Sequence, residues 1–141
     1  MIRTFIIIAL TGLVLASPSV LSQTNKAGQK SSSGKETVDQ VTVYYFHVTR
    51  RCATCLEIEK TAKTYVESKY QGGKQVAFKT VNVDEDKNQA LAEKYQAAGS
   101  MLLVVRGEKV EDITTDAFKY AYTKPAKLET RLKKAIAAVT N

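Results

Sequence analysis

The chain has 141 residues, of which 44% are hydrophobic and 25% charged, and its formal net charge is +7. This composition is typical of one folded domain. Two cysteines exclude a disulfide-dense scaffold, and the single histidine, His47, argues against a metal centre built from several histidines. The basic residues are spread along the chain without forming a stripe, so we expect no nucleic-acid partner.

The N-terminal segment has the pattern of a secretory signal peptide. Arg3 precedes an apolar run from Phe5 to Leu15, and small residues follow this run. A transmembrane helix would need about 20 apolar residues. We therefore expect a signal peptide over residues 1–22, cleaved after Ser22 or after Ala16, and an exported protein, periplasmic or extracellular. It would have no stable membrane span after cleavage; an uncleaved anchor is the alternative.

The next residues are too polar to fold on their own. Residues 23–35 are mostly Ser, Gly, Lys and Gln, a composition that cannot bury enough apolar surface to offset the entropy of ordering. We expect a flexible tether here. The remainder, residues 36–141, is long enough for one compact core and is predicted to be a single domain.

Hydrophobic patterning predicts an alternation of strands and helices in this domain. Strands are expected at 41–47, 76–83, 101–105 and 109–113, and helices at 52–70, at 86–98 and from about 123 onward. Gly99 is expected to stop the second helix. Buried apolar stripes are predicted on the first and last helices, formed by Cys55, Ile58, Ala62 and Tyr65 and by Leu128, Leu132, Ile136 and Val139. Residues 114–122 receive no assignment. Phe118, Tyr120 and Tyr122 alternate there, as in an edge strand or a docking ridge, and we expect these rings to pack. The order β-α-β-α-β-β-α predicts an α/β fold: a mixed four-stranded sheet between helices, as a three-layer α/β/α sandwich.

Two cysteines, Cys52 and Cys55, lie at the expected start of the first helix, just after the first strand. The first N–H groups of a helix are unpaired and its dipole is positive there, so this position stabilises a thiolate. Arg50 and Arg51 add positive charge nearby. Cys52 is therefore the candidate nucleophile, and Cys55, one turn further along, is the candidate resolving cysteine.

Two other interpretations of the cysteine pair stay open. A permanently oxidised structural pair is one, although its small loop would constrain the unfolded chain only slightly. A metal site is the other, but the pair supplies two ligands where a closed zinc site needs four. His47 could be a third ligand or a proton acceptor for Cys55; the alternative is a strand-end histidine bonded to backbone.

The placement of the cysteine pair and the order of elements resemble the thioredoxin fold, from about residue 36 to the end of the chain. Val81-Asn82-Val83-Asp84 also resembles the end of that family's next strand. More narrowly, Tyr45-Phe46-His47 with Arg51-Cys52-Ala53-Thr54-Cys55 resembles a small exported bacterial branch described as a nitrophenyl-compound nitroreductase subunit.

Three departures from the thioredoxin pattern are informative. The family carries a cis-proline before the strand that faces the cysteines, whereas this chain has Ser100-Met101 there, and a cis bond without proline costs about 2.5–4 kcal/mol. We therefore expect a trans bond. Without the proline ring, copper or zinc binding gains weight. The chain also lacks Trp, a Gly-Pro pair between the cysteines and an acidic residue on the first strand.

Several acidic residues receive structural interpretations. Glu57 and Glu59 are expected on a solvated, ion-paired face of the first helix rather than in a proton relay. The cluster Asp84, Glu85 and Asp86 is expected to cap the second helix, because no calcium-loop spacing follows it.

The resemblance and the residues together predict an exported thiol–disulfide oxidoreductase. Cys52 and Cys55 would be its catalytic residues, with His47 and Arg51 as candidates for assisting them and no cofactor. Its partner would be a protein disulfide or dithiol, and reducing members of the family need an upstream reductant. The alternative is a non-enzymatic module, an accessory subunit or a metal-binding protein that uses Cys52, Cys55 and His47.

Overall fold

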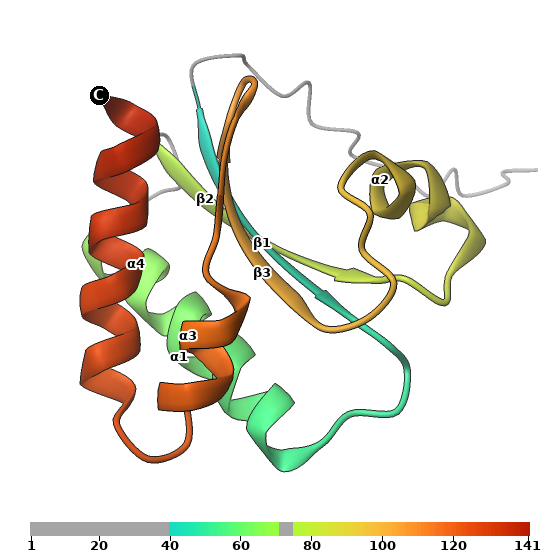
Figure 1. Ribbon diagram of the computed structural model, residues 1–141, viewed down its shortest axis with the longest axis horizontal. Coiled ribbons are helices and arrows are strands. Elements are labelled where there is room, and N and C mark those ends of the chain that lie inside the picture. Colours follow the sequence, from blue (N-terminus) through green and yellow to red (C-terminus); the bar gives the residue numbers. More distant parts are fainter. Residues whose placement is uncertain (1–39, 71–74) are drawn as a thin grey trace, which may run out of the picture. The chain divides into compact units, whose positions relative to one another are not determined.

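The structure is a computed structural model that describes residues 40–70 and 75–141 (Figure 1). The predicted signal peptide and tether lie outside the described residues. Four strands form one mixed sheet in the order β2-β1-β3-β4. They are β1 (Val41–His47), β2 (Val76–Asn82), β3 (Met101–Arg106) and β4 (Lys109–Asp112). β1 pairs in parallel with β2 and antiparallel with β3, and β3 pairs antiparallel with β4.

The strands β1 and β3 are mostly apolar because both faces of each are covered. Alternate side chains of β1 point to opposite faces, and residues 41–46 are all buried. One face of the sheet is covered by α1 (Ala53–Lys69), α3 (Thr114–Tyr120) and α4 (Pro125–Thr140), and the other by α2 (Gln89–Lys94) with the preceding 3-10 turn η2 (Asp86–Asn88) (Figure 1). This is the predicted three-layer, thioredoxin-like arrangement.

Each face of the sheet has its own apolar core. Tyr45 of β1 packs with α1, α3 and α4, while Tyr44 and Phe46 pack with α2. The stripes predicted on α1 and α4 are buried as expected: Cys55, Ile58, Ala62 and Tyr65 on α1, and Leu128, Leu132, Ile136 and Val139 on α4. Pro125 is at the start of α4, where its missing N–H costs no hydrogen bond.

The second helix is shorter than the predicted 86–98. It ends at Lys94 because Gln96 adopts a left-handed conformation with φ 53°. The Gln96 N–H donates to the Glu93 carbonyl at 3.0 Å and the Ala97 N–H to the Ala92 carbonyl at 2.8 Å, which is the Schellman pattern. Gly99 is therefore not the residue that stops the helix, and Ala98 is exposed.

The unassigned segment 114–122 contains a helix, α3, instead of an edge strand. Ala117 of α3 and Ala121, the residue after its end, are both fully buried, while Tyr120 packs at the edge of the core. Phe118 is 41% exposed and Tyr122 67% exposed, so the expectation that these two rings pack was wrong. Small inward residues leave α3 without the apolar stripe that reveals longer helices.

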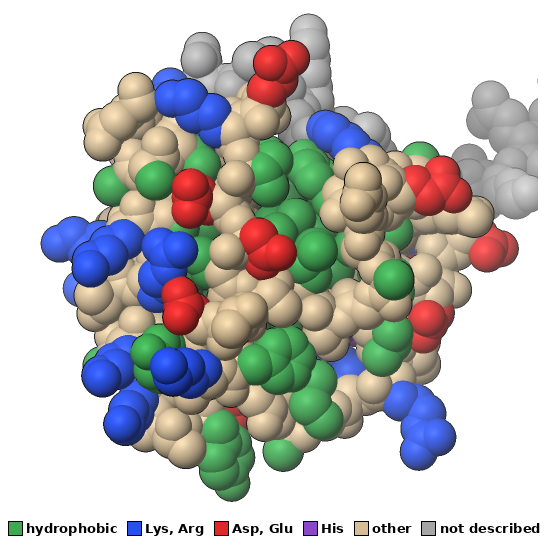
Figure 2. Space-filling view, viewed as in Figure 1, with side chains coloured by type: hydrophobic (Ala, Val, Ile, Leu, Met, Phe, Trp, Pro, Cys, Tyr) green, Lys and Arg blue, Asp and Glu red, His purple; other side chains and the backbone are tan. Residues whose placement is uncertain are grey.

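The surface carries its positive charge unevenly. Lys and Arg side chains gather on the side of the molecule where α4 lies (Figure 2). Lys127, Lys133 and Lys134 of α4 are all exposed. Within the described residues, no helix is both long and apolar enough to cross a membrane.

Candidate active site

The two cysteines form a disulfide at the N-terminus of α1, with their Cα atoms 5.0 Å apart. Cys52 is exposed and Cys55 is 7% exposed. This difference in exposure follows from their places on the helix, since Cys52 precedes the first turn and Cys55 lies on the face against the sheet. A partner molecule can therefore reach Cys52 but not Cys55.

Cys52 is the N-cap residue of α1, with the extended backbone typical of that position. The Cys55 N–H donates to Cys52 Sγ at 3.1 Å, and the Leu56 N–H donates to the Cys52 carbonyl at 3.1 Å. The first turn of α1 contains no acidic residue. A thiolate at Cys52 would therefore accept a hydrogen bond from the helix and interact favourably with its dipole.

The loop before Cys52 is anchored to the end of β2. The Thr49 N–H donates to Asp84 Oδ2 at 2.7 Å, and Asn82 Nδ2 donates to Thr49 Oγ1 at 3.2 Å. The bond from Thr49 holds the pKa of Asp84 below its ordinary value. Asp84 thus fixes the loop that leads to the cysteines. The prediction that this acidic cluster caps the second helix was wrong. Asn88 is the N-cap residue of α2, and Glu85, at the N-cap position of η2, makes no side-chain hydrogen bond to that turn.

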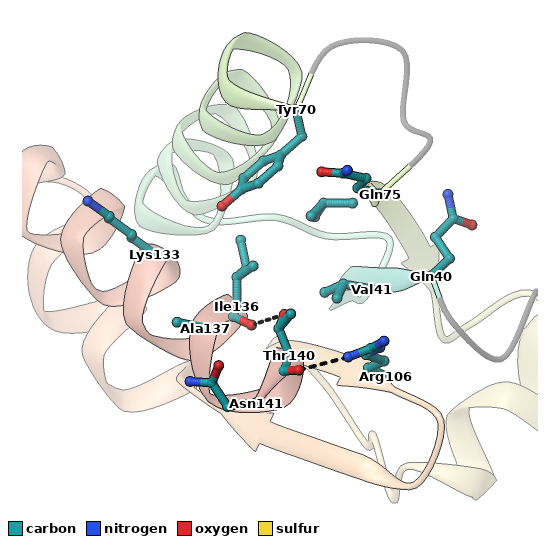
Figure 3. A pocket seen from close by; sticks show the side chains of 11 residues that line it. Gln40, Val41, Tyr70, Gln75, Arg106, Lys133, Ile136, Ala137, Thr140 and Asn141 are labelled. Atoms are coloured by element: carbon teal, nitrogen blue, oxygen red, sulfur yellow. Dashed lines mark hydrogen bonds between the residues drawn. The ribbon is translucent and has the colours of Figure 1, made fainter.

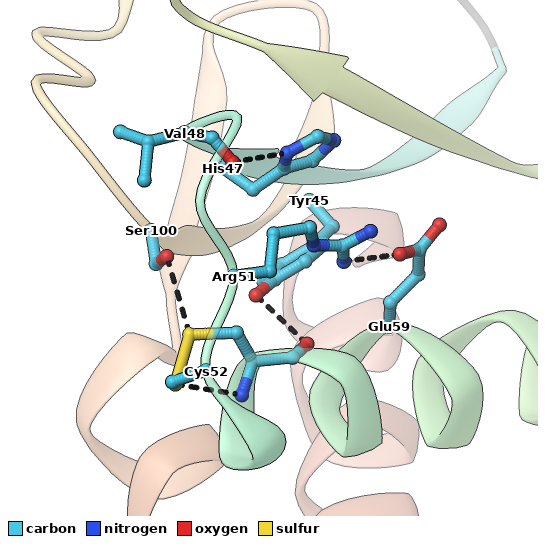
Figure 4. The surroundings of a disulfide bond; sticks show 8 residues. Tyr45, His47, Val48, Arg51, Cys52, Glu59 and Ser100 are labelled. Carbon is cyan, nitrogen blue, oxygen red and sulfur yellow. Dashed lines mark hydrogen bonds and ion pairs between the residues drawn. A yellow bond between two sulfur atoms is a disulfide. The ribbon is translucent and has the colours of Figure 1, made fainter.

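The Arg51 side chain is directed toward Glu59 and not toward the cysteine sulfurs (Figure 4). Its guanidinium forms an ion pair with Glu59 and lies 5.5 Å from the centre of the Tyr45 ring (Figure 4). The Glu59 carboxylate neutralises the charge that we expected Arg51 to offer Cys52. Both glutamates are ion-paired as predicted, since Glu57 pairs with Lys60 at 3.5 Å. The Glu57 side chain is 36% exposed and that of Glu59 only 22%, so the face is less solvated than expected at Glu59.

Two hydroxyl groups contact Cys55. The Tyr45 hydroxyl donates to the Cys55 carbonyl at 2.9 Å, and the Ser100 hydroxyl donates to Cys55 Sγ at 3.7 Å (Figure 4). Burial raises the pKa of Tyr45 above its ordinary value, while hydrogen bonding with Ser100 and Arg51 partly opposes this. The sequence indicates Tyr45 only as part of the first strand and Ser100 only as a residue in place of the cis-proline. The described residues contain no cis peptide bond, as expected for Ser100-Met101.

His47 is bonded to the backbone. Its Nδ1 lies 3.0 Å from the carbonyl oxygen of Val48, and its ring stacks on Tyr45 with centroids 5.9 Å apart (Figure 4). This confirms the interpretation as a strand-end histidine bonded to backbone. In the part of the chain that the structure describes, no three His, Cys, Asp or Glu residues are grouped so that they could hold a metal ion.

A cavity of about 690 Å³ lies at the opposite end of β1 from the cysteines (Figure 3). It is lined by Val41 at the start of β1, Tyr70 after α1 and Ile136 of α4. Arg106 borders it and donates from Nη1 to the Thr140 carbonyl at 2.9 Å. None of the predicted site residues lines this cavity.

The chain is similar to several solved structures at low sequence identity. No protein-family model and no curated protein sequence matches the chain. Among solved structures, a malarial protein is 19% identical, with 68% of this chain and 97% of that chain covered and a TM-score of 0.45. The germline thioredoxin Deadhead of Drosophila melanogaster is 22% identical, with 68% and 81% covered and a TM-score of 0.48. Trxlp of Edwardsiella tarda is 17% identical, with 67% and 82% covered and a TM-score of 0.48. The fold assignment rests on the strand order and layers described above.

Proposed function

We propose that this protein carries out thiol–disulfide exchange through Cys52 and Cys55. The observation that carries the proposal is an exposed cysteine at a helix N-cap, joined to a buried cysteine one turn further along. The Cys52 thiolate attacks a disulfide of a partner protein, and Cys55 then attacks Cys52 Sγ to release the partner's second thiol. The reverse sequence oxidises a dithiol partner, and the reduction potential sets the direction.

We place this activity outside the cytoplasm, in the periplasm or the extracellular space. The support is the signal-like pattern of Arg3 and the apolar run that follows it. A reductant upstream of the pair is part of the proposal, because an oxidising compartment would otherwise keep the pair as a disulfide. The narrower resemblance to a nitroreductase subunit stays a prediction without further support. The metal-binding alternative has less support, since among the residues that the structure describes no three His, Cys, Asp or Glu side chains are grouped so that they could hold a metal ion.

The test is a redox titration of the full chain. The protein is equilibrated with glutathione or dithiothreitol buffers, and free thiols are trapped and counted. We expect a reversible two-electron midpoint. Cys55→Ser should accumulate a mixed disulfide with glutathione at Cys52, while Cys52→Ser should accumulate much less because Cys55 is buried. A pair that never opens under strong reductant would contradict the proposal and indicate a structural bond.

Export has its own test. Expression of the full chain in a bacterium, followed by mass measurement of the periplasmic protein, should show cleavage after Ala16 or Ser22. Cytoplasmic protein of full length would contradict it.

A further inference from the structure

We propose that Ser100 is a catalytic residue of this exchange reaction, whose hydroxyl stabilises the negative charge on Cys55 Sγ while Cys55 resolves the mixed disulfide. The inference rests on the proposed function, and it assigns a role to the residue that replaces the family's proline. Its basis is direct contact, since the Ser100 hydroxyl lies 3.7 Å from Cys55 Sγ although 45 residues separate the two in sequence.

The charge arises in the second step of the exchange. After Cys52 has attacked, it is bonded to one sulfur of the partner, whose other sulfur has left as a thiolate. Cys55 then loses its thiol proton to solvent and attacks Cys52 Sγ. The Cys52–Cys55 bond forms, the Cys52–partner bond breaks, and the partner's second sulfur leaves as a thiolate that takes up a proton. The partner gains two electrons, and the cysteine pair loses them.

Cys55 needs help in this step because it is buried. Burial in apolar surroundings disfavours a thiolate and slows the attack. Among the described residues, no carboxylate forms a hydrogen bond with either cysteine, and Glu59 is held by Arg51. The Ser100 hydroxyl is the side-chain donor that contacts the Cys55 sulfur. A hydrogen bond to an ionised acceptor is roughly twice as strong as one to a neutral acceptor, so this hydroxyl favours the thiolate over the neutral thiol.

Both partners in this contact are held in place. Ser100 directly precedes β3, whose first residue, Met101, is paired with Phe46 of β1. On the other side, the buried Tyr45 hydroxyl fixes the Cys55 carbonyl at 2.9 Å. Tyr45 is therefore a positioning residue, whereas Ser100 touches the reacting atom. The donor needs no rearrangement when the charge develops, which is the condition for effective electrostatic stabilisation.

The experiment separates the two chemical steps. Reduced full-length protein is mixed with dithiobis(nitrobenzoate), and the release of coloured thionitrobenzoate is followed by stopped flow. One equivalent appears when Cys52 attacks and a second when Cys55 resolves. We expect Ser100→Ala to leave the first phase within about twofold and to slow the second about tenfold, the loss of one hydrogen bond to a charged group. The pH midpoint of the second phase should rise by about one unit.

Two further variants make the result specific. Ser100→Thr keeps the hydroxyl and should restore the second phase to within about threefold of the wild type. Ser68→Ala removes a serine hydroxyl from α1 that donates to the Tyr65 carbonyl, away from the cysteines, and should change neither phase.

The outcomes distinguish this inference from the proposed function. Equal second phases in the wild type and Ser100→Ala would overturn the role of Ser100 while leaving the exchange reaction intact. A slow second phase that Ser100→Thr does not restore would also overturn it, because the effect would then be one of packing. Failure of the wild type to release a second equivalent would overturn the exchange reaction itself, and the role of Ser100 with it.

Discussion

Tyr45 links the sheet to the reactive turn of the first helix. Its ring is fully buried, and its hydroxyl donates to the carbonyl of Cys55 rather than to a sulfur. Its position is on the first strand, β1. A tyrosine there fixes the geometry of the helix turn but carries no charge at neutral pH, since burial raises its pKa further. Its contribution is therefore to position Cys55, not to act as a base.

The hydrogen bond from Tyr45 should be measurable in the stability of the fold. Tyr45→Phe leaves the buried Cys55 carbonyl without this donor and removes no apolar volume, so we expect a loss of about 1–3 kcal/mol in the free energy of unfolding. Urea denaturation of the oxidised protein measures it. Tyr122→Phe is the matched control, because its ring is 67% exposed, and it should change stability by less than about 0.5 kcal/mol. Equal effects of the two variants would show that the buried bond contributes nothing.

The stability that Asp84 contributes to the fold should depend on pH. Hydrogen bonds from Thr49 hold its pKa below the ordinary value of 3.8, so the carboxylate favours the folded state. That stability is fully present above pH 3.8 and is lost as the pH falls through the folded-state pKa. Asp84→Asn should therefore be less stable than the wild type at pH 7, and the difference should shrink below about pH 4. Urea unfolding across this range checks it; a difference independent of pH would contradict it.

Hydrophobic patterning predicts best the long elements that are buried along one face or on both faces. β1 matches the expected 41–47, and the stripes of α1 and α4 are buried as expected. Two features were missed for local reasons. α3 is only seven residues long and buries alanines, so it has no strong apolar period. The end of α2 depends on a left-handed glutamine, a conformation that patterning assigns to glycine.

The end of α2 therefore offers a test at the level of one element. Gln96 has a φ of 53°, where a side chain clashes with its own backbone and glycine does not. We expect Gln96→Gly to stabilise the protein by about 0.5–1 kcal/mol, since the relief of strain exceeds the added freedom of the unfolded chain. Glu93→Gly, inside the same short helix, should instead destabilise it by about 1 kcal/mol. Thermal and urea unfolding of both variants decide it, and the same sign for the two would contradict the assignment.

At the level of the whole molecule, the candidate site joins parts that are distant in sequence. The cysteine pair and its place at a helix start could be read from spacing alone. The partners of Cys55 could not, because Tyr45 and Ser100 reach it only once β1 and β3 lie side by side. The pairing of Arg51 with Glu59 was missed for a related reason, since it depends on how the loop before α1 folds back over the helix.

The two apolar cores, rather than the disulfide, should hold the molecule together. The bond between Cys52 and Cys55 closes a loop of about four residues, and chain-entropy arguments give such a loop about 2 kcal/mol or less. Reduction should therefore leave the protein folded, as an exchange cycle requires. Leu132→Ala provides the comparison: this fully buried side chain of α4 should cost about 2–5 kcal/mol.

The measurement is urea unfolding of the wild type with and without excess dithiothreitol, and of Leu132→Ala in the oxidised state. We expect the reduced wild type to keep its cooperative transition and to lose less stability than Leu132→Ala does. Lys133→Ala, the exposed neighbour on α4, should change little and controls for the helix itself. If reduction instead abolished the transition, the pair would be a staple on which folding depends. A cysteine pair of that kind could not cycle between its two states while the fold around Cys55 stays in place.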